Sequence, residues 1–222
     1  MEPQKYTRIK ICCIGSIEEA KLAIKCGASA LGLVGRMPSG PGVISDQEIF
    51  EIAQFTPPPL STFLLTSETS TKDIVGHHQK VFTSTIQIVD SLKEGSYQEL
   101  RKALPATKLV QVIHVIDERS VIQALEAAKW VDALLLDSGN PGAKVKELGG
   151  TGRVHNWDLS KEIREKISIP LFLAGGLNTE NVQKAIETVR PFAVDVCSGV
   201  RSNGSLDEKK LIKFVENVQK IQ

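Results

Sequence analysis

Eight short apolar runs, each followed by an amphipathic stretch, alternate along this chain from end to end. The runs cover residues 8–14, 30–34, 60–66, 83–89, 108–116, 132–137, 170–174 and 193–197. Continuous apolar runs are typical of parallel strands buried on both faces, and parallel neighbours need a crossover helix between them. No linker or change of composition divides the chain, so the pattern predicts an α/β fold: a single (β/α)8 TIM barrel domain over residues 1–222. An open doubly wound sheet is the alternative with the same alternation.

Helix-start residues precede several of the amphipathic stretches. Ser16 stands three residues before Glu19, which is the spacing of a capping box, and Ser45 opens the next helix. A charged stretch leads into a helix expected over residues 121–130. Apolar spacing predicts a last helix over residues 206–221.

Charge and cysteine usage narrow the kind of protein. A net charge of +1 gives no reason to expect nucleic acid or an acidic membrane surface as a partner. No apolar stretch reaches the length of a membrane span and the start lacks a signal-peptide core, so we expect a cytoplasmic protein. Its cysteines are then expected to be thiols, and their spacing predicts no metal site. A homo-oligomer is compatible with the sequence.

Two connections are longer than the chain needs, residues 35–42 and residues 138–156, and the second contains the glycine-rich residues 149–152. Both follow predicted strands, so in a barrel both lie on the carboxyl face, where active sites are built. Mobile covers over a ligand and plain surface loops explain these glycines equally well.

Two reactive side chains end strands that are far apart in the sequence. Cys12 ends the first run, with Lys10 on the same strand face, and Asp137 ends the sixth run. In a barrel interior the thiol and the carboxyl would face each other across a pocket, the minimum needed to add one proton and remove another. The ammonium of Lys10 would increase the thiolate fraction of Cys12. Alternatively, Cys12 is a small core residue and Asp137 caps the strand end.

Two glycine-bearing turns follow the last two predicted strands. Gly175 and Gly176 follow the seventh strand, and Ser198 and Gly199 follow the eighth. Many barrels bind a substrate phosphate at these two places through backbone N–H groups. Asp195, on the same strand face as Cys197, is a candidate inward-pointing polar group.

Taken together, the motifs resemble those of the phosphoribosylanthranilate isomerase family, barrel enzymes of tryptophan biosynthesis. The resemblance covers essentially the whole chain and is carried by residues 10–12, 133–138, 149–157, 174–182 and 190–200. It implies the Amadori rearrangement of N-(5-phosphoribosyl)anthranilate to 1-(2-carboxyphenylamino)-1-deoxyribulose 5-phosphate. Cys12 would be the general base, Asp137 the general acid, and Asp195 would orient the substrate amine. The phosphate would bind at the two glycine turns, with Lys10 beside the substrate and no cofactor, since the substrate nitrogen is the electron sink.

The anthranilate side of the family pattern is altered in this chain. Gly42 stands where the family has the arginine that receives the anthranilate carboxylate, and Arg36 is the nearest cation. Val89 stands where the family has histidine. His114 either compensates for that histidine or is an ordinary core residue.

Two further departures lie near the expected reacting centre. Cys13 replaces a glycine, and Arg201 replaces a glutamate and adds a cation close to the phosphate turns. The departures leave two alternatives open: a paralogous isomerase acting on another phosphorylated aminosugar, and a non-catalytic barrel that binds a phosphometabolite. The presence of Cys12, Asp137 and Asp195 argues against the second, because phosphate binding alone needs none of them.

Overall fold

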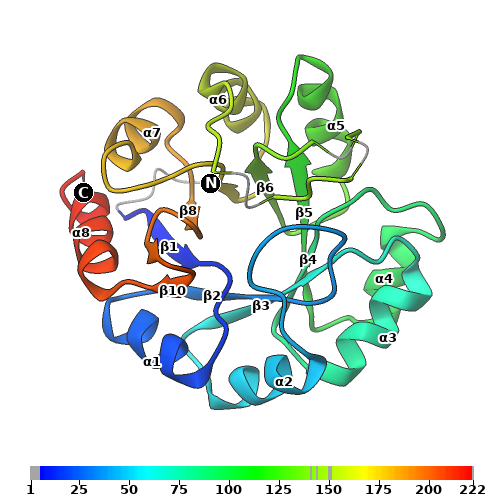
Figure 1. The fold of residues 1–222 in the computed structure, drawn as a ribbon. Coiled ribbons are helices and arrows are strands. Elements are labelled where there is room, and N and C mark those ends of the chain that lie inside the picture. Colours follow the sequence, from blue (N-terminus) through cyan, green and yellow to red (C-terminus); the bar gives the residue numbers. More distant parts are fainter. Residues whose placement is uncertain (1–5, 141, 144, 150–151, 222) are drawn as a thin grey trace.

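The computed structural model describes residues 6–140, 142–143, 145–149 and 152–221, and these residues form a closed barrel of parallel strands ringed by helices (Figure 1). The strands of the barrel are β1 (Arg8–Ile11), β2 (Ala30–Val34), β3 (Ser61–Thr66), β4 (Thr85–Ile88), β5 (Lys108–His114), β6 (Ala133–Asp137), β7 (Leu171–Leu173) and β8 (Ala193–Val196). Each lies inside one of the predicted apolar runs. Because β8 pairs with β1, the sheet has no open edge, and the doubly wound alternative is wrong.

The helices lie outside the strands, where they cover the barrel (Figure 1). They are α1 (Ile17–Lys25), α2 (Asp46–Phe55), α3 (Thr71–Val81), α4 (Tyr97–Ala103), α5 (Arg119–Ala127), α6 (Trp157–Lys166), α7 (Val182–Val189) and α8 (Glu208–Gln219). A short antiparallel pair, β9 (Arg201–Ser202) and β10 (Ser205–Leu206), stands between β8 and α8. The last helix therefore starts at Glu208, after a hairpin that the apolar spacing did not predict.

Strand side chains divide into two apolar clusters because successive residues point to opposite faces. Ile9 and Ile11 of β1 belong to the cluster between the strands and the helices. Cys12, directly after β1, and Leu135 of β6 belong to the cluster inside the barrel. The predicted inward face of these two strands is confirmed, and Lys10 shares it by alternation.

The two predicted serine caps differ in how they are completed. Ser45 and Glu48 form a full capping box at the start of α2, each side chain bonding the backbone of the other residue. Ser16 accepts the backbone N–H of Glu19 at 3.2 Å, but the Glu19 carboxylate accepts the N–H of Gly15 instead of that of Ser16. The Glu19 carboxylate therefore bonds the chain that follows β1 rather than completing the capping box.

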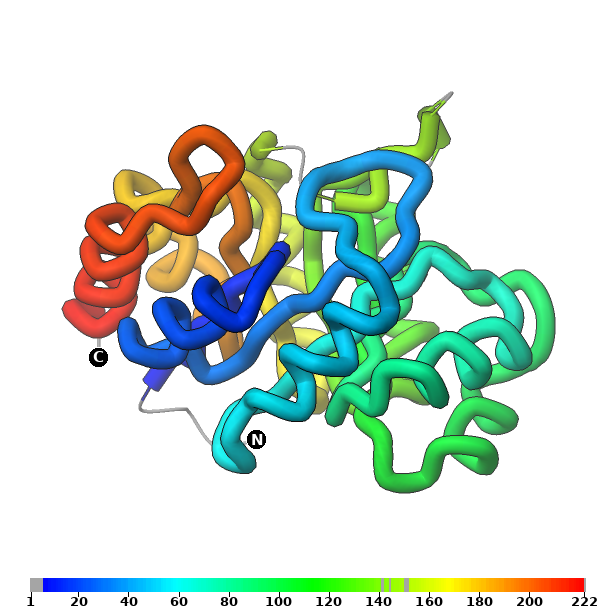
Figure 2. Tube along the Cα trace, turned by 60° about the horizontal axis from the view of Figure 1, so that its bottom comes forward, coloured from blue at the N-terminus to red at the C-terminus, as the bar shows by residue number. Residues whose placement is uncertain are grey.

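The two long connections meet over the carboxyl ends of the strands. Figure 2 shows the blue loop between β2 and α2 rising beside the yellow-green connection that follows β6. The hydroxyl of Ser39 donates to the carbonyl of Lys146 across the two loops, at 2.5 Å. Gly150 and Thr151 of the glycine-rich segment lie outside the described residues. Within the described ranges, no helix has the length and apolar character needed to cross a bilayer.

Candidate active site

A buried ion pair joins the first and last strands of the barrel. The Nζ atom of Lys10 lies 2.9 Å from Oδ1 of Asp195, and the side chains are 0% and 7% exposed. The two residues are directly paired in the β1–β8 register. Burial alone would lower the pKa of Lys10, but the charge of Asp195, the hydrogen bond to it and the nearby cysteines together outweigh burial and raise the pKa. Lys10 is therefore a fixed cation one layer below the barrel mouth.

Gly32 on β2 makes room for the two side chains that project from β1. A Cβ atom at this position would lie 2.9 Å from the sulfur of Cys12 and 2.9 Å from Nζ of Lys10. Any larger residue would displace both groups. The sequence interpretation did not include Gly32, although a glycine inside a strand often marks a close approach of neighbouring groups.

Asp137 ends β6 with its carboxylate at the barrel mouth. Its Oδ1 accepts the backbone N–H of Ser138 at 2.7 Å. A Cβ atom at Gly149 would lie 2.6 Å from Oδ2, so the glycine-rich loop packs closely on the other carboxylate oxygen. The side chain is only 9% exposed. The carboxylate is thus held in one orientation by the strand end and by the loop.

One pocket brings most of the predicted site residues together, and we call it the mouth pocket. Its lining includes Cys12, Asp137, Asp195, Gly175, Gly176 and Ser198. Lys10 is not part of the lining but is bonded to Asp195, which is. Residues from β1, β6, β7 and β8 therefore meet in one cavity, as a closed barrel requires of strand ends that are distant in sequence.

The two predicted phosphate turns lie side by side. Gly175 and Gly176 both have positive φ, 84° and 64°, and a bridge joins Asn178 to Gly199. A Cβ atom at Gly199 would lie 2.0 Å from the carbonyl oxygen of Leu177, a distance that no side chain tolerates. Gly199 is not a lining residue, and its role is to let the two turns touch.

The opposite half of the mouth pocket is apolar. Val34, Met37, Leu65, Val89 and Leu148 contribute to it, and none of the described lining residues is Arg or Lys. Arg36 is exposed and does not line the pocket. Its predicted contact with the substrate therefore has no support in this arrangement of the loop.

Gln87 is a polar exception in this half of the pocket. It is 3% exposed, and its Oε1 atom has no hydrogen-bond partner among the described residues. The sequence interpretation gave Gln87 no role. Its lone carbonyl oxygen is available to a donor on a bound molecule.

His114 lies away from the mouth pocket. Its Nε2 is 2.9 Å from the carbonyl oxygen of Val89, so a proton on that nitrogen makes the bond. The ring instead lines a separate groove between β5 and α5. This position fits the prediction that His114 is an ordinary core residue. Its ring does not replace the missing histidine in the mouth pocket.

His155 is a histidine that the sequence interpretation missed. Its Nε2 lies 2.7 Å from Oγ of Ser160, and burial lowers the pKa of the ring to about 4, although the charge of Asp137 opposes this. A Cβ atom at Gly175 would lie 2.8 Å from Nδ1 of His155. The neutral ring thus packs beneath the first glycine turn and near the carboxylate of Asp137.

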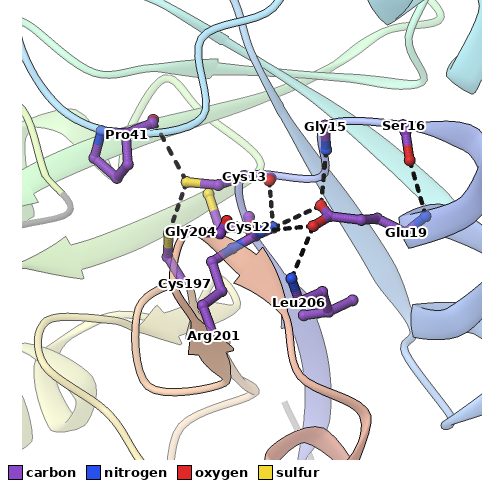
Figure 3. A network of polar contacts seen from close by, with 10 residues as sticks. All are labelled: Cys12, Cys13, Gly15, Ser16, Glu19, Pro41, Cys197, Arg201, Gly204 and Leu206. Carbon is purple, nitrogen blue, oxygen red and sulfur yellow. Dashed lines mark hydrogen bonds and ion pairs between the residues drawn. The ribbon is translucent and has the colours of Figure 1, made fainter.

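The guanidinium of Arg201 is held by a carboxylate and by the chain after β1. Its guanidinium bonds both oxygens of Glu19, at 2.8 and 2.9 Å, and also the carbonyl oxygen of Cys13 (Figure 3). The cation expected near the phosphate turns is therefore already paired with Glu19.

Comparisons with known proteins agree over almost the whole chain. A family model described as N-(5'-phosphoribosyl)anthranilate (PRA) isomerase matches residues 9–217. A relative from Methanosarcina mazei, named N-(5'-phosphoribosyl)anthranilate isomerase 2, is 37% identical over 215 residues, which are 96% of this chain and 94% of the relative.

Solved structures of similarly named proteins share the fold. One is a phosphoribosyl anthranilate isomerase in complex with reduced 1-(o-carboxyphenylamino)-1-deoxyribulose 5-phosphate, with a TM-score of 0.77 and 28% identity over 96% of this chain and 99% of that one. Another contains monomers of the dimeric phosphoribosylanthranilate isomerase from Thermotoga maritima, with a TM-score of 0.78 and 26% identity over the same shares of both chains.

Proposed function

The chain belongs to the N-(5'-phosphoribosyl)anthranilate isomerase family, and we propose that it carries out that isomerisation with Cys12 as the base and Asp137 as the acid. The reaction is the Amadori rearrangement of N-(5-phosphoribosyl)anthranilate to 1-(2-carboxyphenylamino)-1-deoxyribulose 5-phosphate, a step of tryptophan biosynthesis. The observation that carries the assignment is the mouth pocket, where a thiol and a carboxyl from opposite sides of the barrel line one cavity beside two glycine turns.

Asp137 acts first, as its carboxylic acid. It protonates the ring oxygen of the ribose, which opens the ring and leaves a positively charged iminium at C1. The N–H of Ser138 fixes Oδ1, so Oδ2 is the oxygen oriented toward the substrate. The closeness of Gly149 to Oδ2 supports this assignment, because the loop would cover the proton transfer from above.

Cys12 acts second, as its thiolate. It removes the proton from C2, and the electrons flow toward the iminium nitrogen to give an enolamine, which tautomerises to the ketone. Gly32 lets the buried ammonium of Lys10 and the sulfur of Cys12 stand side by side. Asp195 keeps Lys10 charged and lines the pocket where the substrate amine would lie.

The two glycine turns would hold the phosphate. Left-handed Gly175 and Gly176 turn the backbone sharply after β7, and Asn181 supports this turn by donating to the carbonyl of Gly176 at 2.9 Å. Binding energy from the phosphate then positions C2 between acid and base, which lowers the entropy cost of the proton transfers.

A turnover assay with N-(5-phosphoribosyl)anthranilate tests this function. Saturable loss of the substrate fluorescence, with a kcat in the ordinary range of roughly 1–10³ per second, supports it. Competitive inhibition by inorganic phosphate would support the anchoring role of the glycine turns. A chain that binds the substrate but leaves its fluorescence unchanged would contradict the catalytic assignment and favour the non-catalytic barrel.

A second candidate, an isomerase for a related aminosugar phosphate without the carboxylate, is favoured by the absence of Arg and Lys among the described lining residues. The discriminating measurement compares the anthranilate substrate with the corresponding phosphoribosyl aniline, which lacks the carboxylate. A site with a carboxylate-binding cation loses roughly tenfold or more in kcat/KM on the aniline. Equal or higher kcat/KM on the aniline would support the second candidate.

A further inference from the structure

Two cysteines outside the proposed chemistry meet at the edge of the mouth pocket. Cys13 follows β1 and Cys197 follows β8, and their sulfur atoms are 2.7 Å apart (Figure 3). This separation is already shorter than an ordinary van der Waals contact between sulfur atoms. A disulfide bond of about 2.05 Å needs a further approach of only about 0.7 Å.

The backbone holds the Cys13 thiol in this position. Cys13 has a φ of 63°, a left-handed conformation that glycine adopts at little cost and cysteine does not. Across from it, a Cβ atom at Gly42 would lie 2.5 Å from Cβ of Cys13, so the loop between β2 and α2 has a glycine where the thiol needs space. The sulfur also lies 3.7 Å from the carbonyl oxygen of Pro41. The left-handed backbone at Cys13 and the missing side chain at Gly42 together allow the Cys13 thiol to lie against the sulfur of Cys197.

The surrounding charges make one of the two thiols the better nucleophile. Hydrogen bonds with Cys12 and Cys197, together with burial, raise the pKa of Cys13. The hydrogen bond with Cys13 and the charge of Arg201 lower the pKa of Cys197, and together they outweigh burial, which would raise it. The ion pair with Glu19 fixes that guanidinium beside the end of β1. Cys197 is therefore the sulfur that ionises first, and Cys13 keeps its proton.

A second cavity gives small molecules a route to the pair from outside the mouth pocket, and we call it the side pocket. Cys13 and Cys197 line it together with Glu19, Pro41, Gly42 and Arg201. Both thiols thus stand in the wall between the two pockets. Cys12 lines the mouth pocket but not the side pocket.

We propose that Cys13 and Cys197 are a redox-active thiol pair, which a peroxide oxidises to a reversible disulfide at the rim of the active site. The Cys197 thiolate attacks one oxygen of hydrogen peroxide, breaks the O–O bond and releases hydroxide, which leaves a sulfenic acid on Cys197. The sulfur of Cys13 then attacks that sulfenic sulfur, loses its proton and displaces the oxygen as water. Two thiols are oxidised, and one peroxide is reduced to two waters.

The disulfide has a direct consequence for the site, and this part rests on the proposed function. Cys13 is the neighbour of the proposed base Cys12, and Cys197 is the neighbour of Ser198 in the second phosphate turn. Forming the bond draws the two sulfurs together by about 0.7 Å and locks both chain segments; because a misplacement of about 1 Å in a reacting group lowers the rate by roughly 10²-fold, this smaller shift is expected to lower it by roughly tenfold. The oxidised enzyme is therefore roughly tenfold less active, and a thiol reductant restores it.

Peptide mapping tests the disulfide without any assay of activity. The fully reduced protein is treated with hydrogen peroxide, alkylated and digested with trypsin, which places Cys12 and Cys13 in residues 11–21 and Cys197 in residues 185–201. We expect these two peptides to be linked, and the intact protein to be about 2 Da lighter, with two fewer titratable thiols. A protein that instead gains oxygen, or links residues 11–21 only internally between Cys12 and Cys13, overturns the proposal.

Two matched variants identify the sulfur that forms the link. Cys13→Gly replaces a left-handed residue by the one best suited to that conformation, so folding is not at risk, and the link to residues 185–201 disappears. Cys12→Ser retains both Cys13 and Cys197, and its link persists. The reverse result, loss in Cys12→Ser and persistence in Cys13→Gly, would show that Cys12 is the partner and contradict the proposal.

Activity is then measured for each protein relative to its own fully reduced form. Wild type loses roughly tenfold at the peroxide dose that removes two thiols and recovers with dithiothreitol, whereas Cys13→Gly and Cys197→Ser keep most of their reduced-state activity at that dose. Equal inactivation of the wild type and Cys13→Gly would place the damage on Cys12 and overturn the regulatory part. No turnover in the reduced wild type would contradict the proposed function instead, while the peptide link would still stand.

Discussion

The ammonium of Lys10 and the carboxylate of Asp195 are 2.9 Å apart inside the barrel, at directly paired positions of the first and last strands. The contact closes the barrel at the seam where the two ends of the sheet meet. It also places a positive charge beneath Cys12. One ion pair therefore contributes to the fold and to the proposed base.

Removing one member of this pair leaves the other charge buried and alone. We expect Asp195→Ala to lower the free energy of unfolding by about 3–5 kcal/mol, measured by urea denaturation. The double variant Lys10→Met/Asp195→Leu restores most of that stability, because no unpaired charge remains, but it stays inactive. A single variant as stable as the wild type would show that the ammonium finds another partner.

Replacing the proposed base removes the thiolate but keeps the shape of the side chain. Cys12→Ser is expected to lower kcat by roughly 10²–10⁴-fold with little change in the denaturation midpoint, since a hydroxyl does not ionise at neutral pH. Cys26→Ser is the matched control, because Cys26 lies at the end of α1, away from the mouth pocket. A similar loss in both variants would point to a general effect of cysteine replacement.

Asp137→Asn tests the acid. The amide oxygen keeps the bond from the Ser138 N–H, but the side chain no longer carries an acidic proton, so we expect kcat to fall by roughly 10²–10⁴-fold with KM almost unchanged. Asp117→Asn, at an exposed carboxylate paired with Arg119, is the control and should retain full activity. A KM effect without a kcat effect in Asp137→Asn would assign this residue to binding.

Gly199→Ala separates phosphate anchoring from chemistry. The added methyl group meets the carbonyl of Leu177 and pushes the two glycine turns apart. We expect the KM for the phosphorylated substrate and the inhibition constant of inorganic phosphate to rise together, by roughly tenfold. Gly76→Ala, on α3, where a methyl group would contact nothing nearby and the backbone is helical, controls for replacing a glycine. An inhibition constant that does not move would place the phosphate elsewhere.

The buried ring of His155 predicts a loss of stability in mild acid. Because burial lowers its pKa to about 4, the unfolded chain, with a pKa near 6.5, binds the proton more readily between these values. Stability is complete above pH 6.5 and falls as the pH drops toward 4. From pH 7 to pH 5 we expect a loss of about 2 kcal/mol in the free energy of unfolding.

The double variant His155→Phe/Ser160→Ala serves as the comparison. It removes the ring and the hydroxyl bonded to it together, so no buried polar group is left unpaired. Its free energy of unfolding should change by clearly less between pH 7 and pH 5. If the two proteins lose equal stability, the pH dependence comes from other groups.

The barrel was predictable because its signals are local. Each buried strand is a continuous apolar run, and Ser45 with Glu48 marks a helix start within four residues of sequence. Strand alternation then decided the orientation of Lys10 and Leu135 without any knowledge of their neighbours. The hairpin before α8 was missed because the apolar spacing of the helix continues into Leu206, which belongs to β10.

The side-chain partners at the mouth were not predictable, because they depend on how separate loops pack. Cys13 and Cys197 are 184 positions apart, and only the closure of the barrel brings them together. The sequence placed Arg201 close to the phosphate turns but did not show that Glu19, from the other end of the chain, holds it. His155 sits in a connection whose path no periodicity describes.

Gly32 sets a limit on how this barrel can be improved. The space that a side chain at position 32 would need is already filled by the ends of Lys10 and Cys12. Attempts to stiffen β2 by giving it a larger residue would gain strand propensity and displace the proposed base in the same step. Selection for thermal stability without an activity screen would therefore enrich variants at position 32 that are stable but inactive.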